Sequence, residues 1–406
     1  MRGCDPKKIL VGNAEAIDWV RRLEGKGVRS DGLHLDWPEL MRFKRGMIAG
    51  HSDRKEKALN DQDVEVVHGR ARFVDGHTIR VGDRRIEAKK IAIATGAKPG
   101  SLGIAGEEHL TYSDGFLDLE RLPNRIAFIG GGYISFEFAH VAARSGADAI
   151  ILHRGSRPLK GFDADLAMRL AEKSRSIGID IRLERQVVRI ERHGSGLIVG
   201  SVHDGSEETV EVDMVVHGGG RVPAIESLDL DRGGVRTDRG RIVLNEFLQS
   251  TSNPDVYVAG DAAGTGPALT PVAGYQGRVA ASNLIEGNHV PVDYSAIPSV
   301  VFTVPPLAAV GLGEDEAFAR GFKVRVNEAD TAGWYSSRRI GERHSGFKTI
   351  VDEETDRILG AHLLGPGAEE TINLFAMAIH FGLTTGQIRE MLFAYPTHGS
   401  DMPYMT

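Results

Sequence analysis

Three groups of residues in this sequence have types and spacings that fit nucleotide and redox chemistry. The first is the glycine-rich run at 130–135, which follows an apolar stretch and opens a helical pattern. Glycines at such a turn let the backbone approach a pyrophosphate at a helix N-terminus, so the run predicts a dinucleotide loop. Ser135 stands where the motif has its third glycine, and a plain glycine turn is the alternative. The predicted loop residues are Gly130, Gly132, Tyr133 and Ile134.

About 20 residues after this loop, where the motif calls for a residue that binds the ribose, the second strand ends in cationic residues. These are His153, Arg154, Arg157 and Lys160. A carboxylate there would bind a free ribose 2′-hydroxyl, whereas cations complement a 2′-phosphate. We therefore predict NADPH rather than NADH, and a solvated basic loop is the alternative.

The second group surrounds Cys4, the one cysteine among the 406 residues, which Lys7 and Lys8 follow at the start of a helical pattern. A helix N-terminus and nearby cations favour a thiolate. An incidental residue near the end of the chain is equally compatible with the pattern. One cysteine permits neither an intrachain disulfide nor a cysteine-cluster metal site in these residues, and we predict no metal.

The third group is Gly260 and Asp261, which end an apolar run at 256–259. An aspartate at this position can accept a hydrogen bond from a sugar or ribityl hydroxyl. The alternative is a turn aspartate that caps its own loop.

Hydrophobic periodicity and turn residues predict the elements that position these groups. A helix is expected at 6–24, capped by Asp5, with Pro6 at its first position. Short strands at 64–67, 71–74, 78–81 and 91–94 follow. The pattern then predicts a βαβ unit of strand 125–129, helix 133–145 and strand 148–152. Further elements are expected at 163–176 (helix), 179–183, 214–216 and 256–259 (strands) and 271–286 (helix). After a linker at 291–298, the remaining residues alternate strands and helices as a separate domain.

The composition narrows the classes of partner. Lys and Arg number 49 against 56 Asp and Glu, a formal charge of -7, so the chain has no basic footprint for nucleic acid. The apolar stretches are shorter than the roughly 20 residues that span a bilayer, and the start has no secretory signal pattern. We expect a cytoplasmic protein that binds neither nucleic acid nor membrane.

Taken together, the motifs resemble those of the pyridine nucleotide-disulfide oxidoreductases, nearest to the glutathione reductase and mercuric reductase branch. The motifs are Cys4-Asp5-Pro6-Lys7-Lys8, Ala94-Thr95-Gly96, the run 130–137, Gly220-Arg221-Val222-Pro223, Gly260-Asp261 and Gly360-Ala361-His362-Leu363-Leu364-Gly365. The resemblance implies an α/β fold with two Rossmann-like domains and a C-terminal α+β dimerisation domain. It places an FAD domain at 1–118 and 244–294, an NADPH domain at 119–243 and the dimerisation domain at 295–406.

The resemblance also implies an activity and roles for residues. In this family NADPH reduces FAD, the flavin reduces a Cys-x-x-x-x-Cys disulfide, and the dithiol reduces the substrate. Cys4 matches the flavin-facing cysteine, and Lys7 matches the lysine beside the flavin. Tyr133 would gate the nicotinamide pocket, with Glu137 and Val300 nearby. The residues matched to the FAD site and the nucleotide domains are Ala71, Thr95, Gly96, Gly220, Arg221, Gly260, Asp261 and Thr270.

The sequence departs from the family at both ends. The family's first strand, its FAD pyrophosphate loop and its first redox cysteine have no counterpart, so the first domain lacks its N-terminal βαβ start. Because that cysteine would lie two positions before Met1, we expect an internal methionine codon to have been taken as the start. An in-frame stop codon just upstream would contradict this. A chain that begins at Met1 is expected to bind FAD weakly or to fail to fold.

At the other end, Tyr395 replaces the histidine of the His-Pro-Thr motif that supplies the partner subunit's acid/base. A phenol is a poor proton shuttle at neutral pH. His398 or Asp401 could substitute, and surface residues of a tail are the alternative. We expect a homodimer that acts on a small-molecule or disulfide substrate. The competing interpretations are a diaphorase or transhydrogenase that needs no redox disulfide, and a non-catalytic dimeric nucleotide-binding module.

Overall fold

The glycine loop joins a strand to a helix in the computed structural model, which describes residues 3–406. β6 (Arg125–Ile129) leads into α5 (Tyr133–Arg144), and β7 (Asp148–Leu152) follows. Both strands are apolar and buried beyond their first residue, as expected inside a parallel sheet that is covered on both faces. The predicted βαβ unit is confirmed, with α5 one residue shorter than expected.

Two further strands complete a four-stranded parallel sheet around this unit. β12 (Met214–His217) and β8 (Asp180–Arg182) flank it in the order β12-β6-β7-β8. α6 (Ala164–Ser176) precedes β8. Its N-cap residue is Asp163, whose side chain accepts hydrogen bonds from the backbone of the first turn. Between β8 and β12 the chain forms an antiparallel sheet of β9 (Gln186–His193), β10 (Gly196–His203) and β11 (Ser206–Val212).

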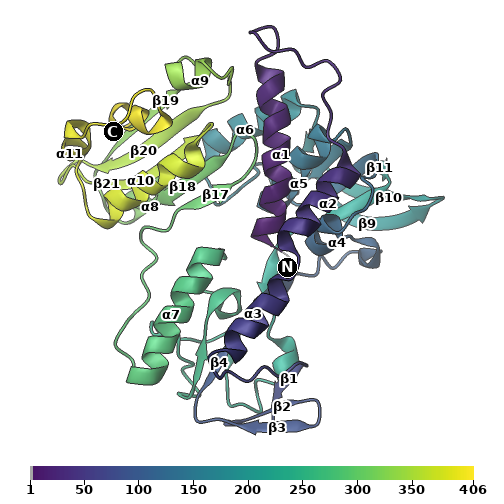
Figure 1. The fold of residues 1–406 in the computed structure, drawn as a ribbon, viewed down its shortest axis with the longest axis vertical. Helices are drawn as coiled ribbons and strands as arrows, with labels where there is room; N and C mark the ends of the chain where they lie inside the picture. The colour runs from purple at the N-terminus through teal and green to yellow at the C-terminus, as the bar shows by residue number, and fades with distance from the viewer. Residues whose placement is uncertain (1–2) are drawn as a thin grey trace. The chain divides into compact units, whose positions relative to one another are not determined.

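The described chain forms two units (Figure 1). The first combines the chain up to Ala49 with Ser101–Gly219 and Ser295–Thr406, and the second combines Gly50–Gly100 with Gly220–Tyr294. These two units do not test the boundaries of the three predicted domains. The division into 1–118 with 244–294, 119–243 and 295–406 therefore stays a prediction.

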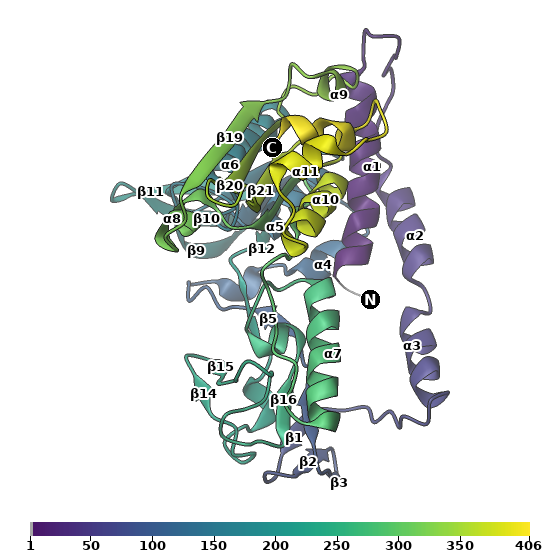
Figure 2. The same cartoon turned by 90° about the vertical axis from the view of Figure 1, so that its left-hand side faces the viewer.

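α1 (Cys4–Arg22) lies in the first unit against α5 and α2 (Trp37–Ile48) (Figure 2). Leu10, Ala14 and Ile17 recur at helical spacing and are buried, so this apolar face holds the helix in place. The predicted cap by Asp5 is wrong. Gly3, with φ +143°, is the N-cap residue, and Asp5 lies within the first turn.

An antiparallel sheet forms the C-terminal part of the first unit. Its strands lie in the order β17 (Ser299–Val301), β18 (Leu307–Gly311), β21 (Ile358–Leu364), β20 (Gly346–Asp352) and β19 (Val324–Asp330). α10 (Ala368–His380) packs against β18 and β21 through its buried apolar face (Figure 1). The shorter helices of the first unit are η1 (Glu107–His109), α4 (Ser113–Leu117), α8 (Glu314–Ala319), α9 (Tyr335–Arg338), α11 (Thr385–Glu390) and η4 (His398–Tyr404). The predicted alternation of strands and helices is confirmed.

The second unit contains the remaining elements. β1 (Ala71–Phe73) and β2 (Thr78–Val81) match two of the predicted strands, and they form an antiparallel meander with β3 (Arg84–Glu87), which was not predicted. β4 (Ile91–Ile93) pairs in parallel with β16 (Val256–Val258), and η3 (Gly260–Ala263) and α7 (Thr270–Glu286) follow β16. The other elements are α3 (His51–Asn60), β5 (Ala97–Pro99), β13 (Arg221–Pro223), η2 (Glu226–Leu228), β14 (Thr237–Asp238) and β15 (Arg241–Ile242).

The predicted strand at 64–67 is wrong, because this segment pairs with no strand among the described residues and Val64 is exposed. An apolar alternation predicts a strand only where a neighbour satisfies its backbone. Across residues 3–406 no helix has both the length and the apolar character needed to cross a bilayer.

Candidate functional site

The glycine loop has the backbone geometry of a nucleotide cradle. Gly130 adopts φ +108°, and a Cβ there would collide with the carbonyl oxygen of Gly218, which follows β12. Gly132 has an extended backbone that any residue can adopt, and the nearest atom to a Cβ there, the Gly218 oxygen, lies at 3.6 Å. The fold thus requires a glycine at 130. The open space at 132 leaves the backbone accessible to a ligand.

The N-terminus of α5 fits an anionic ligand. Its N-cap is Gly132, and no side chain caps the first turn. Ser135, at the place of the third glycine, is fully buried, and a Cβ on Gly218 would collide with its hydroxyl. The small serine side chain therefore allows the close approach of α5 to the end of β12 that a glycine usually provides. These features fit the pyrophosphate of NADPH.

His153 contacts the loop but does so as a structural residue. Its Nδ1 accepts the Gly131 N–H at 3.0 Å, so its Nε2 carries the proton and donates to the Arg157 carbonyl at 3.0 Å. Burial lowers the pKa of His153, which keeps the ring neutral at neutral pH. Arg154 and Lys160 are exposed. The cationic group near the loop therefore consists of the arginines and Lys160 rather than His153.

The first two turns of α1 and the first two turns of α5 meet through Glu137. This carboxylate is 1% exposed and forms an ion pair with Lys7 through Oε2. Its Oε1 accepts the backbone N–H of Phe302 at 2.8 Å and lies 3.3 Å from the Lys8 ammonium. One buried carboxylate thus holds the cysteine-bearing helix and the segment after β17.

Lys8, which was expected only as one of the cations near Cys4, is a second cation that contacts Glu137. Its ammonium lies 3.1 Å from the centre of the Phe302 ring. Burial lowers the pKa of Lys8 to about 8, and Lys7 adds to this effect, whereas Glu137 opposes it. Lys8 therefore loses its charge around pH 8 rather than above pH 10. The signal available in the sequence was its spacing of four residues from Cys4, which places both on one side of the helix.

The residues expected around the nicotinamide lie at this same junction. Tyr133 is 41% exposed, and the Lys7 ammonium lies 4.7 Å from the centre of its ring. Ile134 is buried in the adjoining core. Val300 lies in β17, two residues before Phe302. Cys4 is exposed at the first turn of α1, three residues before Lys7. The first unit thus brings together Cys4, Lys7, Tyr133 and Glu137 by sequence proximity and direct contact.

The residues matched to the FAD site lie in the second unit. Gly96 (φ +72°) and Gly260 (φ +68°) follow the paired strands β4 and β16. No hydrogen bond to the Asp261 carboxylate is found among residues 3–406, and Thr270 begins α7, whose first turn has no side-chain cap. An acceptor and a helix N-terminus beyond the carboxyl ends of two parallel strands fit a ribityl chain and a flavin edge.

The other predicted residues of this unit have backbone roles. Arg221 donates to the Ala97 carbonyl and lies in β13, which pairs with β5. Gly220, with φ +118°, accepts the Gly100 N–H at 3.1 Å. Ala71 pairs with Val81 in the meander. The contacts of Arg221 and Gly220 hold β5, the strand that follows Thr95 and Gly96.

The C-terminal residues point in different directions. Tyr395 is 79% exposed. His398 and Asp401 instead line a cavity of about 30 Å³ inside their own subunit, together with Ser336 and Thr371. Ser336 donates a hydrogen bond to Asp401. Burial lowers the pKa of His398 and raises that of Asp401, because it disfavours the charged form of each side chain.

Comparisons with known proteins agree with this geometry. Residues 1–277 match the pyridine nucleotide-disulphide oxidoreductase family, and residues 297–405 match the dimerisation domain of that family. A mercuric reductase from Lysinibacillus sphaericus is 31% identical over 399 residues, which cover 97% of this chain and 73% of the relative. A glutathione reductase from Burkholderia cepacia is 33% identical over 398 residues, covering 98% of this chain and 88% of the relative.

A solved structure also resembles the chain over nearly its whole length. It is a Cu(II) complex of the HOCl-induced flavoprotein disulfide reductase RclA from Escherichia coli. The TM-score is 0.86 at 29% sequence identity, and the match covers 99% of this chain and 88% of the RclA chain.

Proposed function

The chain belongs to the pyridine nucleotide-disulphide oxidoreductase family, and from this premise we propose that Cys4 is the thiol that reacts with the substrate. The protein is a flavin-dependent oxidoreductase that uses FAD and NADPH to reduce a disulfide-type acceptor. Bound FAD would supply the two-electron chemistry that links NADPH to the thiol. The observation that carries the assignment of Cys4 is its place in the first turn of α1, beside the buried Lys7–Glu137 pair.

The proposed reaction at Cys4 is a thiol–disulfide exchange. The Cys4 thiolate attacks one sulfur of the substrate disulfide, which forms a mixed disulfide and releases the other sulfur as a thiol. The second sulfur of this bond comes from the substrate, and two electrons that pass from NADPH through the flavin would reduce the bond, which returns Cys4 as a thiolate and releases the second half of the substrate as a thiol. Exposure of Cys4 at a helix N-terminus supports this role because an attacking thiolate must be accessible.

Residues of α5 and the glycine loop would hold NADPH. Gly130 and Gly132 would admit the pyrophosphate, and the exposed Arg154 and Lys160, with Arg157, would face the 2′-phosphate. Tyr133, Ile134 and Val300 would line the nicotinamide end, with Glu137 fixing Lys7. FAD would be held by the second unit. The residues proposed there are Ala71, Thr95, Gly96, Gly220, Arg221, Gly260, Asp261 and Thr270.

The chain carries the family's dimerisation domain, which supports a homodimer. Within the dimer we assign Tyr395 as the group presented at the partner's site, because it is exposed while His398 and Asp401 face their own cavity. A cytoplasmic setting is proposed because a thiol that must remain reduced between turnovers needs a reducing compartment.

A diaphorase is the second candidate, and two observations favour it. The 406 residues hold one cysteine, and Tyr395 stands where the family has its acid/base histidine. Such an enzyme would pass electrons to a quinone without thiol chemistry. Membership of a family of enzymes argues against a non-catalytic nucleotide-binding module.

Kinetics of the full chain loaded with FAD separate the two candidates. NADPH oxidation is measured with glutathione disulfide and with a quinone, in wild type and in Cys4→Ser. Our proposal expects Cys4→Ser to lose disulfide turnover and to keep quinone turnover. Equal disulfide turnover in both proteins would refute the role of Cys4 and favour the diaphorase.

A further inference from the structure

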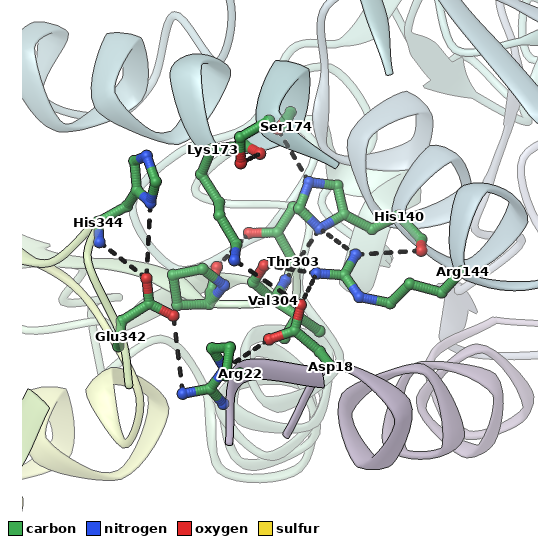
Figure 3. A network of polar contacts seen from close by, with 12 residues as sticks. Asp18, Arg22, His140, Arg144, Lys173, Ser174, Thr303, Val304, Glu342 and His344 are labelled. Carbon is green, nitrogen blue, oxygen red and sulfur yellow. Dashed lines mark hydrogen bonds and ion pairs between the residues drawn. The ribbon is translucent and has the colours of Figure 1, made fainter. Parts of the chain in front are cut away.

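A buried polar network lies at the end of α1 opposite Cys4 (Figure 3). Its centre is Asp18, which is 4% exposed. One Asp18 oxygen accepts from Arg144 of α5 at 2.6 Å and lies 3.7 Å from Lys173 of α6. The other accepts from Arg22 at 2.7 Å. Three cations from three helices thus surround one carboxylate.

The network also includes the C-terminal part of the unit. Arg144 donates to the Val304 carbonyl at 3.0 Å, and the Val304 N–H donates to His140 Nδ1 at 3.1 Å. His140 therefore carries its proton on Nε2, which donates to Ser174 at 2.9 Å. Arg22 lies 3.8 Å from Glu342, which precedes β20. Asp18 is thereby connected to α5 and α6 directly, and to Val304 and Glu342 through Arg144 and Arg22.

Asp18 is indispensable to the charge balance of this network. Arg144 is 3% exposed and Lys173 is 7% exposed, so both cations are withdrawn from water. Glu342 reaches only Arg22 among the three. Without Asp18, Arg144 and Lys173 would be neighbouring buried charges with no carboxylate partner, which is strongly unfavourable.

The same two helices are joined a second time at their other ends. Lys7 of α1 binds Glu137 of α5, and Asp18 binds Arg144. The two contacts are about 16 Å apart along α1 and about 10 Å apart along α5, at 1.5 Å per residue. A helix held by apolar ridges alone can shift along its neighbour, whereas two ionic contacts fix both its rotation and its position along the axis.

We propose that Asp18 is a positioning residue for the reactive end of α1, because it fixes the helix against α5 and so keeps Cys4 and Lys7 in register with Glu137. This inference rests on the proposed role of Cys4. Asp18, fourteen positions after Cys4 in the sequence, thus helps to position the Cys4 thiol.

The structure provides a matched control in a second buried ionic cluster. Lys348 of β20 is 6% exposed and binds Asp163 at 3.0 Å and Asp165 at 2.7 Å, which joins the C-terminal sheet to α6. None of its ion pairs within residues 3–406 reaches α1. Loss of either cluster should lower global stability, but only the loss of Asp18 should release α1.

The test is amide hydrogen exchange of the full chain under native conditions, followed by mass spectrometry of residues 4–14. We compare wild type with Asp18→Asn, the double variant Asp18→Asn/Lys173→Met and Lys348→Met. The double variant removes a buried cation together with the carboxylate, so it folds if the single variant does not. We expect exchange of residues 4–14 to rise about tenfold in the Asp18 variants and to stay unchanged in Lys348→Met.

A kinetic comparison of the FAD-loaded proteins completes the test. A displaced thiol should lower kcat for disulfide reduction, while KM for NADPH stays within about twofold because the glycine loop is untouched. Unchanged exchange of residues 4–14, an equal rise in Lys348→Met, or faster exchange with unchanged kcat would each overturn the proposal. If Cys4 has no redox role, Cys4→Ser will keep disulfide turnover whatever the exchange data show. A failure of the proposed function can therefore be told apart from a failure of the positioning role of Asp18.

Discussion

Asp18 of α1 and Arg144 of α5 form a buried ion pair with a nitrogen–oxygen distance of 2.6 Å, although 126 positions separate them in the chain. Together with the Lys7–Glu137 pair, this contact joins the cysteine-bearing helix to the helix that begins at the glycine loop. The fold thus links the thiol and the glycine loop through one pair of helices.

Stability should depend on Asp18 in a pH-dependent way. Burial opposes ionisation, but Arg144, Lys173 and Arg22 hold the pKa of Asp18 below its usual value. A carboxyl with a depressed pKa stabilises the fold above its unfolded pKa and loses this effect as pH falls through the folded pKa. Asp18→Asn should therefore lower the free energy of unfolding by about 3 kcal/mol at pH 7.

Denaturant titrations at several pH values check this prediction. The difference between wild type and Asp18→Asn should shrink as the pH falls below about 4, because the unfolded carboxyl begins to take up protons there. A difference that stays constant down to the acid transition would contradict the assigned ionisation.

Lys8 should also make stability rise with pH, but in an alkaline range. Its pKa falls from 10.5 to about 8 on folding because of burial beside Lys7 and despite Glu137. Between these values the unfolded chain binds more protons, so this group makes stability rise with pH. Relative to Lys8→Met, wild type should gain stability from pH 8 to 10.5 and show a constant difference from pH 6 to 7.5. Parallel curves throughout would disprove the buried position of Lys8.

The two glycines of the loop should respond differently to alanine. Gly130→Ala should lower stability by about 1–3 kcal/mol, because of its positive φ and the collision with Gly218. Gly132→Ala should keep the melting temperature of wild type, since its backbone is extended and its surroundings are open. The Kd of Gly132→Ala for NADPH should rise about tenfold or more, because the added methyl group would obstruct the approach of the pyrophosphate to the backbone. Calorimetric binding with unchanged affinity in Gly132→Ala would count against this loop as the nucleotide site.

Arg154 and His153 should have separable effects on cofactor preference. Arg154→Ser should reduce the ratio of kcat/KM for NADPH over NADH by about tenfold, as expected for a lost phosphate contact. His153→Ala should mainly lower the melting temperature, since its ring nitrogens bind Gly131 and Arg157. A preference that changes with His153 and not with Arg154 would reverse these assignments.

Local sequence patterns predicted the elements whose formation depends on residues close together in the chain. The strand 125–129, the glycine loop and α5 were predictable because an apolar run, glycines and helical periodicity follow one another there. The pattern left residues 25–63 unassigned, yet α2 has an Asp36 side-chain cap and a proline in its first turn, which are recognisable signals. α3 has no buried residue and therefore no apolar periodicity to read.

The site residues that belong to sequence motifs could be predicted, whereas contacts between segments far apart in the chain could not. Cys4, Lys7 and Glu137 follow from the resemblance to a family, but the contact of Lys8 with Phe302 joins residues far apart in the chain. Two of the three cations that bind Asp18, Arg144 and Lys173, lie on other helices, α5 and α6. Such pairings depend on tertiary packing, which no local spacing encodes.

The central claim is that the substrate disulfide reacts at Cys4, and trapping the adduct tests it most directly. The full chain loaded with FAD is reduced by NADPH, mixed with glutathione disulfide, quenched with acid and analysed by peptide mass spectrometry. Our account predicts one glutathione adduct on Cys4 that appears within turnover and disappears with excess NADPH. Turnover of the disulfide with no adduct on Cys4, at a rate matched by Cys4→Ser, would contradict it.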